Sequence, residues 1–226
     1  MSASHDQRII HSSEESDWRT PPECYQALSR EFCFVVDLAA DRANHLTRSW
    51  FGPGSTDGED ALAIDWPVVG YDGIGASLSC PVAGFLNMPF SRKKARAYRS
   101  GRIQNVAGVW EPHPIDPYLA TVYEVETWAK KCWEQSQRGC TIVAVMPFTP
   151  QTEWYRKYVL GHTEDFRGWS GHAAQQERRL PHRISFLRPD GSAADNAGVN
   201  SVIVVWTPMT GVVGPWQPHS FYWSYR

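Results

Sequence analysis

Residues 85–91, with the sequence FLNMPFS, combine the groups that modification of a base amine requires. The apolar run 82–86 is expected to form a strand that delivers Asn87 to the carboxyl edge of a sheet, where α/β folds bind ligands. The side-chain oxygen of Asn87 and the next backbone carbonyl can accept hydrogen bonds from an exocyclic amine, and Phe90 can stack on an extruded base. The alternative is an ordinary turn at a strand end, because Asn and Pro are common in turns.

The segments around this motif predict an α/β fold. Apolar runs of strand length lie at 34–37, 82–86, 141–146, 183–187 and 201–206. Helical patterns cover 23–31 and 121–137, and their alternation with the first three runs predicts a mostly parallel sheet. The last two runs have no crossover helix between them, so they are expected to pair as an antiparallel hairpin.

The chain is expected to fold as one domain with two flanking segments. Its 226 residues, 42% of them hydrophobic, supply one sizeable core. Residues 1–16 are polar and predict a flexible arm, whereas residues 208–226 form an aromatic tail. The first helix is expected to begin with a capping box, in which Thr20 is the N-cap, Pro21 the first helical residue and Glu23 the third.

Composition excludes several classes of protein. The net charge of −2 excludes a purely electrostatic nucleic-acid binder. No apolar run approaches the roughly 18 residues of a membrane span, and the polar first twenty residues lack the apolar segment of a signal peptide. Five cysteines without paired short spacings predict no disulfide framework and fit a reducing cytoplasm. The scattered histidines predict no metal site.

Several segments occur in an order and spacing that are typical of one family. They are 18–22 (WRTPP), 34–40 (FVVDLAA) with Asn44, 65–66 (DW), 85–91 (FLNMPFS), 128–131 (WAKK), 143–152 with Trp154, and 183–186 (RISF). In these features the chain resembles the phage-type DNA N6-adenine methyltransferases, the phage Dam family. The resemblance covers residues 17–207, which are taken as the methyltransferase domain.

The resemblance implies a Rossmann-like class I fold that depends on S-adenosylmethionine, with a mostly parallel sheet ending in an antiparallel hairpin. It implies direct methylation of the N6 amine of an adenine flipped out of double-stranded DNA, in the cytoplasm of a bacterial host. The resemblance implies no membrane partner, and it does not indicate an oligomeric state. The implied catalytic residues are Asn87, Met88, Pro89 and Phe90.

The resemblance also implies a cofactor site. Its positions are Thr20, Pro21, Asp37, Ala39, Asp65 and Trp66. Asp37 would hold the ammonium group of the cofactor, with Thr20 and Pro21 near its methionine end, and Asp65 would accept a hydrogen bond from its adenine amine. Both carboxylates end apolar segments, where burial without a partner would be costly. The small side chain of Ala39 leaves room for close approach.

Met88 departs from the family pattern, Asn/Asp-Pro-Pro-aromatic, in which the second residue is proline. Methionine keeps the backbone carbonyl and loses the rigid φ angle of proline. The alternatives left open are a non-catalytic relative that binds DNA or cofactor, transfer of a larger group to adenine, and methylation of the N4 amine of cytosine.

A basic stretch follows the motif within the segment 92–120, which is basic and then rich in proline and is a candidate DNA-recognition element. The residues expected to contact DNA phosphates are Arg92, Lys93, Lys94, Arg96 and Arg99, and Arg102 continues the run. A solvated helix face is the alternative interpretation of these charges.

Overall fold

The computed structural model describes residues 18–66, 81–88, 125–163, 165, 167–169, 173–194, 200–208 and 218–225, and the backbone of 102–104 and 110–112. The helices in these ranges are α1 (Pro22–Ser29), α3 (Val125–Gln137) and α4 (Glu153–Tyr158). The strands of the main sheet are β1 (Cys33–Asp37), β2 (Ser49–Trp50), β3 (Val82–Asn87), β6 (Ile142–Pro147), β7 (Gln176–Arg179), β8 (Ser201–Trp206) and β9 (His219–Tyr222). A separate two-stranded ribbon consists of β4 (Arg102–Gln104) and β5 (Trp110–Pro112).

The main sheet has seven strands in the order β2-β1-β3-β6-β8-β7-β9. The neighbours β2, β1, β3 and β6 pair in parallel, β8 is antiparallel to both β6 and β7, and β9 runs parallel to β7. This mixed sheet with a single reversed strand confirms the expected α/β methyltransferase-like fold. The edge at which β1, β3 and β6 end is called the carboxyl edge below.

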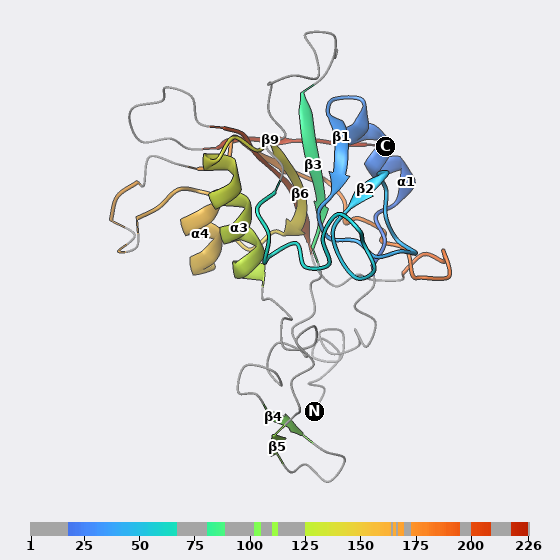
Figure 1. Cartoon of the computed structure of the whole chain (residues 1–226). Coiled ribbons are helices and arrows are strands. Elements are labelled where there is room, and N and C mark those ends of the chain that lie inside the picture. The colour runs from blue at the N-terminus through green and yellow to red at the C-terminus, as the bar shows by residue number, and fades with distance from the viewer. Residues whose placement is uncertain are drawn as a thin grey trace, which may run out of the picture.

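Each face of the sheet carries its own apolar core. Figure 1 shows α3 and α4 on one side of the sheet and α1 on the other. Side chains of β6 alternate between the two: Ile142, Ala144 and Met146 join the core under α3 and α4, whereas Val143 and Val145 join the core under α1. Burial of β6 on both faces explains why its sequence reads as an uninterrupted apolar run.

The strand that precedes β8 and pairs with it is β7, and the predicted strand at 183–187 is wrong. Strand β7 has the sequence QERR, so its pattern gave no sign of a strand. Residues 183–186 are not in a strand, and Leu187 makes only isolated bridges to Arg19 and Ala193. The apolar side chains Ile184 and Phe186 instead cover the core under α1.

Two charged residues of β7, Glu177 and Arg178, are buried with partners on opposite faces of the sheet. The Arg178 side chain, 3% exposed, lies 2.8 Å from a carboxylate oxygen of Glu31. Its guanidinium also lies over the rings of Phe32, Phe221 and Trp223. On the opposite face, buried Glu177 accepts a hydrogen bond from the Tyr155 hydroxyl at 2.7 Å. Strand β9, from the aromatic tail, therefore supplies part of the environment that stabilises Arg178.

The expected capping box is wrong. Helix α1 begins at Pro22, its N-cap residue is Pro21 in an extended conformation, and no side chain caps it. The backbone carbonyl of Pro21 accepts hydrogen bonds from the amides of Cys24 and Tyr25, both at 3.1 Å. Because the helix starts one residue later than expected, the Thr20 hydroxyl is not used for capping.

Two further findings concern the described residues. Cys33 is disulfide-bonded, which the absence of paired short spacings did not predict, whereas Cys24, Cys132 and Cys140 are buried free thiols. No helix in the described part of the chain is long and apolar enough to cross a membrane.

Candidate active site

The carboxyl edge brings Asp37 and Asn87 together. Strands β1 and β3 pair in parallel with Asp37 opposite Phe85, so Asn87 lies two residues further along the neighbouring strand. Side chains two residues apart in a strand share a face. Since Phe85 belongs to the core under α1, Asn87 also faces α1, and its contact with Trp18 agrees with this placement.

The amide of Asn87 has a defined orientation. Its Nδ2 donates a hydrogen bond of 2.8 Å to the backbone carbonyl oxygen of Trp18. A carbonyl oxygen only accepts hydrogen bonds, so this contact fixes which end of the amide is the NH₂ group. The other end, Oδ1, is buried and has no hydrogen-bond partner among the described residues. The site therefore holds an acceptor whose lone pairs are unused.

The Thr20 hydroxyl is a second unused group at this edge. Thr20 is 5% exposed, and its Oγ1 has no hydrogen-bond partner among the residues that the structure describes. Leaving a buried polar atom unpaired costs about 1–3 kcal/mol. Thr20 lies two residues after Trp18, which itself holds Asn87. Two unpaired buried atoms joined through this short segment indicate a place where a polar ligand binds.

Asp37 is a buried carboxylate that forms no ion pair with a lysine or arginine among the described residues. It is 3% exposed, and its Oδ2 accepts a hydrogen bond of 3.0 Å from the backbone amide of Leu46. Burial raises its pKa to about 6, while hydrogen bonds from the amides of Leu46 and Ala39 and the nearby His45 act in the opposite direction. No lysine or arginine of the described residues forms an ion pair with it. The charge would be stabilised by a cationic group brought by a ligand.

Asp65 and Trp66 lie elsewhere. The Asp65 side chain is 62% exposed and forms an ion pair with Arg138, which follows α3. The Trp66 ring is buried in the core under α3 and α4, and its backbone carbonyl contacts the Cys140 thiol just before β6 begins. These residues are therefore near the start of β6, at the edge opposite Asn87. Burial of an unpaired charge is therefore costly for Asp37 and not for Asp65.

Comparison with known proteins matches residues 8–218 to the family described as DNA N-6-adenine-methyltransferase (Dam). The chain belongs to this family. No curated protein and no solved structure matches it. The match confirms the resemblance and the activity that it implied, N6-adenine methylation of DNA. No finding favours cytosine methylation, transfer of a larger group or a non-catalytic relative.

Within this Dam-family chain, the unusual residue Met88 faces away from Asn87. Its side chain is 2% exposed and packs in the core under α3 and α4. The methionine therefore fills the core and does not line the α1 face of the carboxyl edge. The rest of the motif, Pro89 and Phe90, lies outside the described residues, as do Arg92, Lys93, Lys94, Arg96 and Arg99. Of Arg102, only the backbone in β4 is described.

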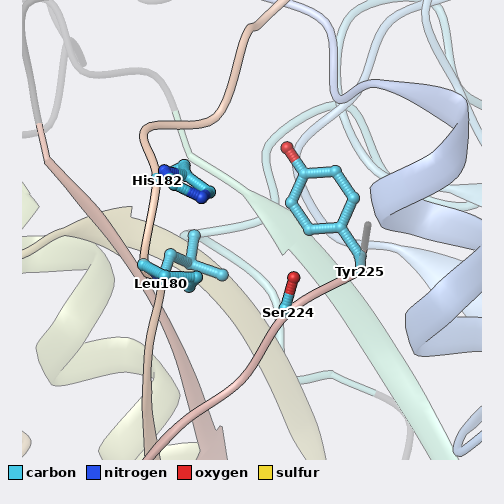
Figure 2. A pocket seen from close by; sticks show the side chains of 5 residues that line it. Leu180, His182, Ser224 and Tyr225 are labelled. Carbon is cyan, nitrogen blue, oxygen red and sulfur yellow. The ribbon is translucent and has the colours of Figure 1, made fainter.

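A shallow hollow lies beyond the ends of β7 and β9. It is lined by Leu180, Pro181, His182, Ser224 and Tyr225. Figure 2 shows the rings of His182 and Tyr225 on two sides of it, above Leu180 and Ser224. None of the residues predicted for catalysis or cofactor binding in this Dam-family protein lines the hollow. Two residues beside the site were not predicted for it: Trp18, which holds Asn87, had no expected role, and Leu187, which bridges Arg19, was expected in a strand.

Proposed function

We propose that this Dam-family enzyme transfers a methyl group from S-adenosylmethionine to the N6 amine of an adenine flipped out of double-stranded DNA, at specific sites and in a phage or prophage setting. The observation that carries the proposal is the oriented amide of Asn87. Its Oδ1 is buried with no hydrogen-bond partner in the described part of the chain, and its Nδ2 is held by Trp18. An acceptor kept free in this way suits an incoming amine, which has two N–H donors.

The residues at the carboxyl edge fit the cofactor. S-Adenosylmethionine, when bound, supplies an electrophilic methyl group and also carries an ammonium and a carboxylate. Asp37, which is buried and pairs with no lysine or arginine of the described residues, would hold the ammonium group. The unpaired Thr20 hydroxyl and the neighbouring Pro21 would lie against the methionine end, and the small side chain of Ala39 would leave room beside them. We leave Asp65 and Trp66 out of this site because they lie at the opposite edge.

Asn87 would raise the reactivity of the adenine amine. Its Oδ1 would accept a hydrogen bond from one N–H, and the backbone carbonyl of Met88 would accept the second. These two bonds favour a pyramidal nitrogen whose lone pair is less delocalised into the ring. Phe90 would stack on the extruded base. Because the acceptors are neutral and fixed before the base arrives, they would favour the transition state without rearranging.

DNA would be held in part by the basic stretch after the motif. Arg92, Lys93, Lys94, Arg96 and Arg99 carry positive charge close in sequence to Asn87 and Phe90. Contacts to phosphates fix the position of a protein on DNA, and enzymes that modify a base take it out of the stack. The charge pattern of this stretch supports its contact with DNA phosphates.

The deciding experiment compares wild type with Asn87→Ala. DNA treated with each enzyme is digested to nucleosides, and N6-methyladenine is measured by mass spectrometry. We expect loss of methylation in the variant, with S-adenosylmethionine affinity measured by calorimetry within about threefold of wild type. A matched control is Gln137→Ala, which removes an exposed amide at the end of α3 and should leave methylation unchanged. Normal methylation by Asn87→Ala would refute the assignment of Asn87.

A further inference from the structure

A short hairpin at residues 186–194 is hydrogen-bonded to residues 18–19, the segment that contacts Asn87. The amide of Ala194 donates to the carbonyl of Phe186 at 2.8 Å, and the amide of Arg188 donates to the carbonyl of Ser192 at 2.9 Å. Gly191 closes the turn with a φ of +83°, a conformation that glycine adopts readily. Phe186 and Ala194 are 1% and 4% exposed, so the base of this hairpin is anchored in the protein.

Leu187 of this hairpin is joined to Arg19 by a reciprocal pair of hydrogen bonds. The amide of Arg19 donates to the carbonyl of Leu187, and the amide of Leu187 donates to the carbonyl of Arg19, both at 2.9 Å. This antiparallel bridge fixes the backbone on the carboxyl side of Trp18. The carbonyl of Trp18 belongs to the peptide unit that contains the Arg19 amide, so the bridge sets the direction of that carbonyl.

A continuous series of contacts therefore runs from the hairpin to the catalytic motif. Leu187 holds the Trp18–Arg19 peptide, the Trp18 carbonyl holds Nδ2 of Asn87, and this leaves Oδ1 of Asn87 free. We infer that Leu187 is a positioning residue, whose backbone bridge to Arg19 orients the Asn87 amide toward the target amine. The inference rests on the proposed role of Asn87 and adds the residue that sets its geometry.

The test removes one hydrogen bond of the bridge. Leu187→Pro deletes the amide that donates to the Arg19 carbonyl, so the bridge is reduced to the single bond from the Arg19 amide, in the Trp18–Arg19 peptide unit, to the Leu187 carbonyl. We expect the weakened bridge to lower kcat for DNA methylation about 10- to 100-fold, because small errors in the position of a catalytic group cost about that much. The KM for DNA and the affinity for S-adenosylmethionine should stay within twofold. Asp190→Ala is the matched control, since it removes contacts within the turn, to Ser192 and Arg188, and should leave kcat unchanged.

A second readout does not depend on activity. In ¹⁵N-labelled enzyme, the Asn87 side-chain NH₂ group should have one proton protected from exchange with water. Its exchange should become at least tenfold faster in Leu187→Pro and stay unchanged in Asp190→Ala. Replacing the Leu187 amide by an ester removes the same donor with little change of shape, and it serves if the proline variant does not fold.

The background Asn87→Asp separates positioning from general stability. A carboxylate can accept from the target amine but cannot donate to the Trp18 carbonyl, so adding Leu187→Pro should lower kcat less than twofold further. A full further loss in the double variant, or unchanged exchange and kcat in Leu187→Pro and in the ester, would overturn the inference. Normal methylation by Asn87→Ala would instead overturn the proposed function, with the exchange result still reporting on the bridge.

Discussion

The affinity for S-adenosylmethionine should depend on pH through Asp37. Burial raises the pKa of this carboxyl to about 6, so the group is mostly neutral below that pH and mostly charged above it. With that pKa about 9% of Asp37 is ionised at pH 5 and about 90% at pH 7. Only the ionised form can pair with the cofactor's ammonium group. We therefore expect the dissociation constant to be roughly tenfold larger at pH 5 than at pH 7.

Calorimetric titration between pH 5 and 7 measures this dependence while staying below the range in which an α-amino group loses its proton, about 7.7–8.0. Asp37→Asn should bind about 10- to 100-fold more weakly at pH 7 and show no slope with pH. The neighbouring His45 also influences Asp37, so His45→Gln is the control and should keep most of the slope. Equal affinity at both pH values in wild type, or an unchanged slope in Asp37→Asn, would refute the assignment of Asp37 to the ammonium group.

The remaining predictions concern stability, the opposite edge of the sheet, DNA and folding pH. Met88→Pro should lower the free energy of unfolding by about 1–3 kcal/mol in urea titrations, because a buried side chain leaves the core, yet methylation at 20 °C should persist; unchanged stability would contradict this packing. Asp65→Ala should leave cofactor affinity within twofold by calorimetry, since its carboxylate is exposed and paired with Arg138; a tenfold loss would bring Asp65 back into the site. Changing Arg92, Lys93 and Lys94 to alanine should reduce the salt slope of DNA binding by about 0.9 for each phosphate that is no longer neutralised, and an unchanged slope would mean that they face solvent. The pKa of Asp37 is about 6 in the folded chain and 3.8 ordinarily, so the contribution of the protonated group to stability is complete below about pH 3.8 and disappears as pH rises through about 6. Relative to Asp37→Asn, wild type should lose up to ~3 kcal/mol of unfolding free energy across that window, and a constant difference in Tm would contradict this.

The sequence predicts the strands that are buried through apolar side chains. Strands β3, β6 and β8 were expected at their observed places because both faces of each are covered. Strand β7 was missed because Glu177 and Arg178 are buried only with partners that lie far away in sequence, such as Tyr155 and Glu31. Propensity and periodicity contain no information about such pairs.

In the candidate site, too, local sequence predicts some features and only the fold determines the others. Asn87 was predicted from a local motif and does lie at the carboxyl edge. Its contact with Trp18 joins residues 69 apart, so local sequence patterns do not reveal it. Thr20 was expected to cap α1, but the extended Pro21 takes the N-cap position and leaves the hydroxyl unpaired. Asp65 has the same local pattern as Asp37, and only the fold separates the exposed carboxylate from the buried one.

Strand β7 also has a consequence for synthesis on the ribosome. Both of its neighbours, β8 and β9, follow it in sequence, and 43 residues separate Arg179 from Tyr222. At about 5–20 residues per second, β7 waits roughly 2–9 seconds for its second neighbour. An apolar strand with an open edge would be prone to aggregation during that time. The charged sequence QERR remains hydrated until β9 is synthesised. The composition that makes this strand hard to predict therefore also protects the growing chain against aggregation.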